Sequence, residues 1–436
     1  MASAPSKGDG SPNTARHADR QRHHRGSFRR AHHKDQHDGD APKLGPLPDN
    51  PRVPTGKAVL IDNDADLIDA LGRMRQTDGI AYDTEFIGES SYHPLLCVIQ
   101  LSTVDEIVLV DPLADIDITP IWELLADAAV RKWVHAGEQD LEPVVRHLGR
   151  PAANVLDTQI AAGFCHMAYP VSLAKLTAEL LGYRPGKGLT FTDWSERPLS
   201  GRQLHYAADD VRFLPAMAAI LEQRLADAGH ADHAQTEADA LCSLDRHRFD
   251  LDDATGRVKS AGSLTPAQKC VLRELVAWRD QRSRDNDLPP RAFVKDEVLI
   301  YLSRKRKLKV SELSGIKFMP RPVAQDFGDE IVAAWQAGTA EAENAPPPPK
   351  IPDEPTPTER FHASAFHAAV AALCHSRGID PDLVASRQET MKIAHRHLSG
   401  RSIDGLPMFN GWRGVAVGES VKGLLDGVDV HISWKP

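Results

Sequence analysis

Two carboxylates stand at alternate positions in an otherwise apolar stretch of the chain. The segment GIAYDTEFIGE carries Asp83 and Glu85 among aliphatic and aromatic residues, which is typical of a buried β-strand. Side chains alternate between the faces of a strand, so these two acids share one face with Ala81, opposite Tyr82 and Thr84. Unpaired acids this close raise each other's pKa unless a cation lies between them, and their hard oxygen atoms suit Mg²⁺ or Mn²⁺. The alternatives are an exposed sheet edge with solvated acids, or acids paired with arginine.

Two further segments supply acids at positions suited to the same site. KWVHAGEQDLEPVV places His135 at the end of a strand and Asp140 in the first turn of the next helix, where acids also complement the helix dipole. QLHYAADDVRFLPAM places Tyr206 and Asp210 four residues apart, on one face of a helix, beside its core-facing stripe. Their neighbour Asp209 is expected to be solvated. A structural pair, in which the phenol satisfies the acid, is the alternative for Tyr206 and Asp210.

The order D-x-E, H-A-x-x-x-D, Y-x-x-x-D resembles the ribonuclease D family of DEDD-type 3′–5′ exonucleases, in the branch whose third motif contains tyrosine. The stretches LDTQIAAGF (156–164), SLAKLTAELLG (172–182) and TDWSERPLS (192–200) are similar to the same family. The resemblance covers most of residues 57–225. It implies an α/β domain with a ribonuclease H-like fold and a mixed sheet.

The resemblance also implies a chemistry, hydrolysis of a phosphodiester by in-line displacement with two divalent ions, Mg²⁺ or Mn²⁺. Asp83, Glu85, Asp140 and Asp210 are then the expected metal ligands. Asp83 is expected to be shared by both ions, and Asp140 to act partly through water. Tyr206 is expected to orient the attacking water, because a phenol with a pKa near 10 is a poor base at neutral pH.

Five other side chains near these motifs are candidates for substrate binding. Phe86 and Gln100 are candidates for contact with the terminal nucleotide, with a place in the core as the alternative for Phe86. Trp194 is a candidate for stacking on a base and Arg197 for pairing with phosphate, with ordinary packing as the alternative. His135 is more readily explained as a residue that fixes the corner between strand and helix.

The elements that must position these residues follow from hydrophobic periodicity. A strand near 58–61 and a helix near 64–74 precede three strands, 80–86, 96–102 and 106–112, the last two joined by a hairpin turn. Helices and strands then alternate: helix 118–127, strand 131–136, helix 138–149, strand 154–158, and helices 158–167, 172–181 and 202–228. Asp157 is interpreted as the N-cap of the helix that begins at 158. This pattern predicts one α/β domain over 55–230, which the resemblance implies is the exonuclease domain.

Residues 264–340 contain helical patterns and no convincing strand. The segment AWRDQRSRDNDLPPRAFVKDEVLIYLSRKRKLKVSELSGI resembles an HRDC domain, a module found in helicases and in ribonuclease D. The expected helix starts are Thr265, Lys295, Ser311 and Pro322. The resemblance implies accessory contact with nucleic acid, for which a basic cluster is the candidate surface: Arg304, Lys305, Arg306, Lys307 and Lys309. A solvated helix end is the alternative.

Three remaining segments complete the domain organisation. Residues 1–50 are polar, with almost no large apolar side chains, and are predicted to be a disordered tail. Residues 341–358 are a Pro-rich acidic linker, and 359–436 a second helical domain whose match to the HRDC-like pattern is weak.

Composition excludes several classes of protein. Five cysteines without a CxxC pair argue against a disulfide framework or a zinc–thiolate site and favour the reducing cytoplasm. No apolar run approaches the roughly 18 residues of a membrane helix. The net charge of −9 means that an RNA-binding surface must be local.

The expected function is a metal-dependent 3′–5′ exoribonuclease that trims 3′ ends of tRNA precursors or other structured RNA and releases nucleoside 5′-monophosphates. RNA is the expected partner, and neither a membrane nor a protein partner is inferred. The alternatives are a DNA 3′–5′ exonuclease of the same chemistry and a catalytically silent RNA-binding module.

Overall fold

The computed structural model describes residues 46–88, 90–186, 189, 192–343 and 356–427. Nearly all of the predicted tail, 1–50, lies outside the described residues. Most of the predicted linker, 341–358, lies outside them as well.

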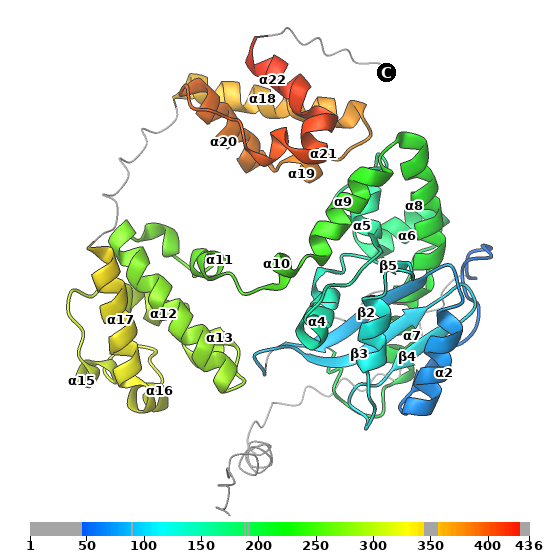
Figure 1. Ribbon diagram of the computed structural model, residues 1–436, viewed down its shortest axis with the longest axis horizontal. Helices are drawn as coiled ribbons and strands as arrows, with labels where there is room; N and C mark the ends of the chain where they lie inside the picture. Colours follow the sequence, from blue (N-terminus) through cyan, green and yellow to red (C-terminus); the bar gives the residue numbers. More distant parts are fainter. Residues whose placement is uncertain (1–45, 89, 187–188, 190–191, 344–355, 428–436) are drawn as a thin grey trace, which may run out of the picture. The chain divides into compact units, whose positions relative to one another are not determined.

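A six-stranded mixed sheet organises the first half of the chain, in the order β1-β4-β3-β2-β5-β6 (Figure 1). The meander β2–β3–β4 is antiparallel, whereas β1 runs parallel to β4, β5 parallel to β2, and β6 parallel to β5. The strands are β1 (Val59–Ile61), β2 (Ile80–Ile87), β3 (Leu95–Ser102), β4 (Ile107–Val110), β5 (Lys132–Val134) and β6 (Val155–Asp157). The predicted α/β fold with a mixed sheet and an early hairpin is confirmed.

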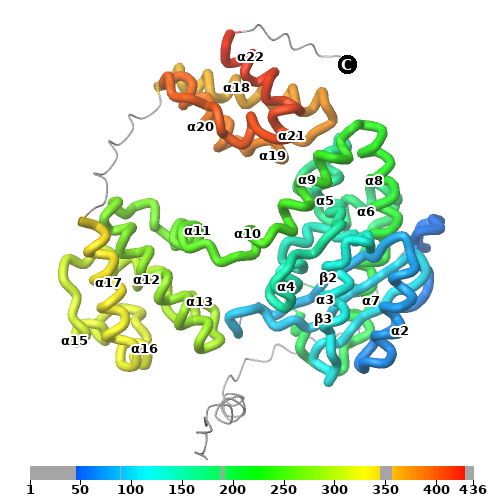
Figure 2. Tube along the Cα trace, in the orientation of Figure 1, coloured from blue at the N-terminus to red at the C-terminus, as the bar shows by residue number. Residues whose placement is uncertain are grey.

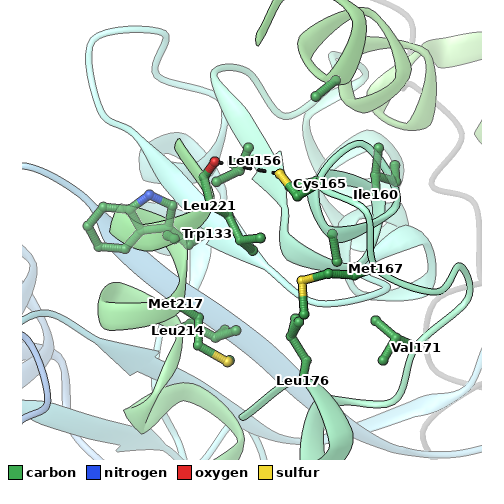
Figure 3. Close-up of a cluster of buried hydrophobic side chains, with 14 of the residues drawn as sticks. Trp133, Leu156, Ile160, Cys165, Met167, Val171, Leu176, Leu214, Met217 and Leu221 are labelled. Carbon is green, nitrogen blue, oxygen red and sulfur yellow. Dashed lines mark hydrogen bonds between the residues drawn. The ribbon is translucent and has the colours of Figure 1, made fainter. Parts of the chain in front are cut away.

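Helices cover both faces of this sheet and create two apolar cores. One core, here called the α2–α4 core, joins Tyr82 of β2 to Leu67, Ile121 and Leu141 of the three helices. The other, the α5–α8 core, contains Met167, Leu176, Leu214 and Leu221 (Figure 3). The helices are α2 (Asp64–Met74), α3 (Thr119–Leu125), α4 (Glu138–Leu148), α5 (Thr158–Gly163), α6 (Leu173–Leu181), α7 (Gly201–Arg212) and α8 (Leu214–Ala228).

The prediction of one continuous helix over 202–228 is wrong, because the structure divides it into α7 and α8 at Phe213. Pro215 lies in the first turn of α8, and its ring nitrogen has no hydrogen to donate to a preceding turn. Helix α9 (Ala231–Cys242) then lies beside α8 (Figure 2). The Gln235 side chain donates a hydrogen bond to the Val155 carbonyl of β6 (3.1 Å), so this helix packs on the α/β domain beyond residue 230.

Strand β2 extends beyond its parallel neighbour β5, so the second half of this edge of β2 has no strand paired with it. Its pairing with β5 involves only Ile80 and Ala81, while β3 pairs with the opposite edge from Ala81 to Ile87. The N-terminal turn of α4 lies against the uncovered edge, where the Tyr82 hydroxyl donates to the Asp140 carbonyl (2.9 Å). The sheet thus places the acid-bearing half of β2 beside a helix N-terminus.

The backbone between β5 and α4 makes a tight corner that limits which residues can occupy positions 136 and 137. Ala136 has a φ of 55°, in the left-handed region. A Cβ atom on Gly137 would lie 2.7 Å from the Val134 Cβ, so only glycine fits without displacing the strand. The direction in which α4 leaves the sheet is therefore fixed by the backbone.

The Asp157 side chain connects the corner between β5 and α4 to the corner between β6 and α5 by hydrogen bonds. Its buried carboxylate accepts hydrogen bonds from the backbone N–H groups of Ala136 (3.2 Å) and Gly137 (3.0 Å). It also accepts from Gln159 (2.8 Å) and Ile160 (3.3 Å), and this caps α5 as predicted. One carboxylate therefore holds the start of two helices.

The residues that follow form two helical groups. Short helices α10 (Leu244–His247) and α11 (Leu251–Gly256) precede the first group: α12 (Pro266–Asp285), α13 (Pro290–Phe293), α14 (Asp296–Ser303), α15 (Val310–Leu313), α16 (Arg321–Asp326) and α17 (Gly328–Ala342). Thr265 caps α12, as predicted. The prediction of a cap at Ser311 is wrong, because α15 already begins at Val310, after Lys309.

The first group has its own core. Helices α12 and α17 approach so closely that a Cβ atom on Gly338 would lie 2.5 Å from the Val271 Cα. Leu272, Leu299 and Ile331 are buried between the helices. This packing agrees with the predicted all-helical domain.

The second group is α18 (Pro357–Ser376), α19 (Pro381–Val384), α20 (Arg387–Leu398), α21 (Gly411–Arg413) and α22 (Glu419–Leu425). Helix α18 begins inside the predicted linker because Thr356 and Glu359 form a capping box. In the described parts of the chain, no helix has the length and apolar content needed to cross a membrane.

Replacing Asp157 with alanine is expected to lower the free energy of unfolding by about 3 kcal/mol, because four backbone N–H groups lose a buried acceptor. Urea denaturation followed by circular dichroism measures this. Asp250→Ala is the matched control, since Asp250 caps α11 at the surface and its loss is expected to cost about 1 kcal/mol. Equal losses in the two variants would contradict the role given to Asp157.

Candidate active site

A pocket of about 580 Å³ opens beside the second half of β2. Asp83 and Glu85 line it and are half-buried, as the alternation of β2 predicts for residues on one face. Its other lining residues are Thr84, Phe86, Ala136, Glu138, Gln139 and Asp140. The pocket therefore lies where β2 meets the N-terminus of α4.

Asp140 reaches this pocket from α4. It occupies the third position of the helix, as predicted, and its carboxylate accepts a hydrogen bond from the Thr84 hydroxyl. Its backbone carbonyl accepts from the Tyr82 hydroxyl. Two side chains on the α2–α4 face of β2 thus hold Asp140 at the open edge of the strand.

Tyr206 and Asp210 reach the acids from α7. This helix packs on β2, β3 and β4 through Ala207, Ala208 and Val211, which belong to the α5–α8 core. The Tyr206 phenol and the Asp210 carboxylate lie one helical turn apart on α7, and each shifts the pKa of the other.

The acids come together although the helices that carry them lie on opposite faces of the sheet. Helix α4 packs on the α2–α4 core and α7 on the α5–α8 core, so they approach β2 from opposite faces. The expectation that Asp209 is solvated is wrong, since it is only 6% exposed. It forms an ion pair with Arg212 (3.0 Å), a partner three residues further along the helix.

The four carboxylates disfavour one another's charge. Burial raises the pKa of Asp83 well above its usual range, and repulsion from Asp140, Asp210 and Glu85 raises it further. Burial raises the pKa of Asp210 likewise, with Glu85 as the next cause. The pKa of Glu85 rises to about 7, through burial and then Asp140, and burial raises that of Asp140 to about 6.

Nothing cationic in the described chain offsets this repulsion, since none of the four acids forms an ion pair with Lys, Arg or His there. Within the described residues, the alternative of acids paired with arginine is therefore not observed at these four positions. No three of the described His, Cys, Asp and Glu side chains are already arranged around a common cation position. The donor set nevertheless fits divalent cations, because it consists of hard oxygen atoms whose mutual repulsion a cation removes.

The substrate-binding candidates Phe86 and Gln100 have different environments. Phe86 lines the pocket and is half-buried, next to a register shift between Glu85 and itself in the β2–β3 pairing. Gln100 is fully buried, and neither its Oε1 nor its Nε2 has a hydrogen-bond partner within the described chain. Phe86 is accessible to a ligand in the pocket, whereas Gln100 is not.

His135 is held on both sides of its ring. Nδ1 lies 2.9 Å from the Thr158 hydroxyl and Nε2 lies 3.0 Å from the Val171 carbonyl. Burial lowers the pKa of His135. These contacts agree with the interpretation that His135 fixes the corner that leads into α4.

Trp194 and Arg197 hold the segment before α7. The Arg197 guanidinium donates to both Asp111 oxygens (2.5 and 2.6 Å) and to the Cys97 carbonyl (2.8 Å). Trp194 is 4% exposed, with its ring centroid 6.1 Å from that of Tyr206. The positions of Trp194 and Arg197 support the packing alternative rather than contact with a base or phosphate.

Sequence reasoning missed three residues that position this site. Thr84 and Tyr82 bind Asp140, and Asp111 anchors Arg197. A signal existed for each: polar side chains in a core-forming strand, and an acid directly after a strand in VDP. Their partners, however, are remote in sequence, at separations of 56, 58 and 86 residues.

Comparison with known proteins places this geometry in a family. A family model described as 3′–5′ exonuclease matches residues 58–226, and one described as HRDC domain matches residues 268–347. Ribonuclease D of Gluconacetobacter diazotrophicus is 33% identical over 372 residues, which are 85% of this chain and 93% of that protein. Ribonuclease D of Escherichia coli is 28% identical over 84% of this chain and 98% of that protein.

The solved structures agree. The crystal structure of E. coli RNase D, an exoribonuclease involved in structured RNA processing, matches with a TM-score of 0.71 at 28% identity, over 85% of this chain and 99% of that one. The predicted exonuclease and HRDC domains are thereby confirmed. The exonuclease domain of this family depends on divalent metal ions and its substrate is nucleic acid. The chain belongs to the ribonuclease D family and is a 3′–5′ exoribonuclease.

Proposed function

We propose that Asp83, Glu85, Asp140 and Asp210 hold two divalent ions, Mg²⁺ or Mn²⁺, and that this site removes nucleotides from RNA 3′ ends as nucleoside 5′-monophosphates. The observation that carries the proposal is the meeting of four half-buried carboxylates at the open edge of β2 without a basic partner in the described chain. When bound, the ions would stabilise the charge that develops on the phosphoryl oxygens and help to ionise the attacking water.

The chain's own residues would prepare the reacting groups. Asp140 is held by a hydrogen bond from the Thr84 hydroxyl, and Asp210 lies one helical turn from Tyr206 on α7. Burial and then the Asp210 charge raise the pKa of the Tyr206 phenol further above its usual value. A phenol that stays protonated donates a hydrogen bond, so Tyr206 would orient the attacking water rather than deprotonate it.

Structured RNA, including tRNA precursors, is the proposed substrate. The E. coli relative is an exoribonuclease involved in structured RNA processing, and the same combination of exonuclease and HRDC domains supports a similar substrate here. Phe86 is the side chain best placed to contact the terminal nucleotide, because it lines the pocket beside Asp83 and Glu85.

The basic cluster of the HRDC domain is proposed as an accessory RNA-binding surface. It lies between α14 and α15, where Arg304, Arg306, Lys307 and Lys309 are exposed. Lys305 is paired with Glu312 (3.5 Å). Tyr301, 47% exposed, lies under the Lys305 ammonium at 5.3 Å and offers a ring on which a base can stack.

Asp83→Asn is expected to lower kcat by about 10³-fold, since it removes one charged metal ligand and the several kcal/mol of transition-state stabilisation that depend on it. Tyr206→Phe is expected to cost less, about 10²-fold, with KM unchanged. End-labelled RNA and DNA, incubated with and without Mg²⁺ or Mn²⁺, measure both effects, and chromatography identifies the released nucleotide.

Asp105→Asn, at an exposed position in the turn between β3 and β4, is the control and is expected to retain full activity. Undiminished cleavage by Asp83→Asn would refute the metal-ligand assignment. Faster degradation of DNA than of RNA would favour the DNA exonuclease.

Metal-free protein is expected to lose stability as the pH rises from about 4 to about 7. The folded carboxylates have raised pKa values, so the folded state binds more protons than the unfolded state across this interval. Adding Mg²⁺ is expected to restore the thermal midpoint, most strongly near the upper end of that interval. Differential scanning fluorimetry with chelator or Mg²⁺ tests this, and Glu85→Gln is expected to flatten the metal-free profile.

Three exposed cluster cations have neither an ion pair nor a side-chain hydrogen bond within the described chain, whereas Lys305 pairs with Glu312 and Arg304 donates to Ser263. Replacing these three together (Arg306→Gln, Lys307→Gln and Lys309→Gln) is expected to raise KM for long RNA by about 10-fold and to weaken its salt dependence. Hydrolysis of a dinucleotide is expected to be unchanged, because that substrate does not extend beyond the pocket. The charge-matched control is Arg150→Gln, Lys175→Gln and Arg224→Gln, three exposed positions of the exonuclease domain. Equal effects of the two triple variants would indicate a response to net charge alone.

A further inference from the structure

Gln100 has an environment that the fold alone does not explain. It lies in the middle of β3, directly opposite Asp83 of β2 on one side and Leu109 of β4 on the other. Its side chain is 0% exposed, under α7. Both amide atoms, Oε1 and Nε2, are without a hydrogen-bond partner in the described chain.

Other amides of the same domain are satisfied. Gln203 accepts from the Ser200 backbone N–H (2.9 Å) and donates to the Asp193 carbonyl (3.2 Å). Gln235 accepts from Arg131 and donates to the Val155 carbonyl. A buried amide without partners destabilises the folded state, whereas methionine or leucine in the same space would not. The amide of Gln100 therefore lacks a partner in this arrangement of the described side chains.

The register identifies the group that this amide faces. Directly paired residues of an antiparallel sheet lie on the same face, with Cβ atoms about 5 Å apart, so the side chains of Gln100 and Asp83 are neighbours. The neighbours on this face along β3 are Val98, which is apolar, and Ser102, whose hydroxyl donates to the Thr103 carbonyl (3.0 Å). Leu109, across from Gln100 on β4, is apolar as well. Asp83 is the polar side chain paired directly with Gln100 across the sheet.

We propose that Gln100 is a positioning residue for Asp83: its Nε2–H donates to the Asp83 carboxylate when that carboxylate is ionised and faces a divalent cation. This inference rests on the proposed metal site. A carboxylate that binds a cation through one lone pair has others free to accept hydrogen bonds, and such outer partners fix its orientation. Gln100 was a candidate for contact with the terminal nucleotide, but its full burial prevents that contact, so it acts through Asp83.

Gln100→Met tests this inference, because it keeps the volume of the side chain and removes the amide. In metal-free protein the thermal midpoint is expected to rise by about 2–4 °C, since an unpaired buried amide is lost. The Kd for Mn²⁺, measured by isothermal titration calorimetry, is expected to weaken by about 10- to 100-fold. Activity on RNA is expected to recover as Mn²⁺ is raised, with KM for RNA unchanged at saturating metal.

Gln235→Met is the matched control, because its amide has partners and lies on α9, away from the acids. It is expected to lower the metal-free thermal midpoint and to leave the Kd for Mn²⁺ unchanged. Gln100→Asn, which retains the amide but shortens its reach, is expected to give an intermediate Kd and serves if Gln100→Met does not fold.

Three results would overturn the inference. An unchanged Kd for Mn²⁺ in Gln100→Met, with normal binding in the wild type, would remove the positioning role while the metal site stands. A raised KM that saturating metal does not correct would indicate a direct nucleotide contact. Absence of Mn²⁺ binding by the wild-type protein would overturn both this inference and the proposed function.

Discussion

The repulsion among four carboxylates at the open edge of β2 is the constraint on which the exonuclease domain depends. Asp83, Glu85, Asp140 and Asp210 raise one another's pKa values, and no basic side chain of the described chain offsets their charge. The fold must hold them together against this repulsion. Such a site favours cation binding, because a bound cation offsets the electrostatic repulsion that destabilises the metal-free folded protein.

The fold meets this constraint by fixing the ends of the elements that carry the acids. Helix α4 starts at a corner that Asp157 and Gly137 determine. Helix α7 starts at a capping box of Ser200 and Gln203, after a segment that Arg197 ties to Asp111. The two helices approach β2 from opposite faces, so neither apolar core has to enclose all four acids. Half-burial keeps the carboxylates accessible while the helix starts keep them in place.

The acids proposed to bind metal and the cations proposed to bind RNA are separated along the chain. The overall charge of −9 includes the four acids at the open edge of β2, whereas the exposed cations of the HRDC domain lie between α14 and α15. This separation is physically useful, because cations placed within the pocket would pair with the carboxylates and lower their affinity for metal. A polyanionic substrate can be attracted elsewhere, provided that the strand is long enough to reach both surfaces.

The sequence by itself indicated the family through the resemblance of its motifs, and it predicted the mixed sheet because strand alternation and helical spacing are local properties. The same motifs supplied the four acids and Tyr206 as candidate site residues. The tertiary structure decided what lies against them. Arg197 binds Asp111, Asp209 binds Arg212, and Gln100 is buried opposite Asp83. The face of the sheet on which α4 packs also depends on where β5 ends beside β2. Such pairings join residues remote in sequence, and only the packed sheet brings them together.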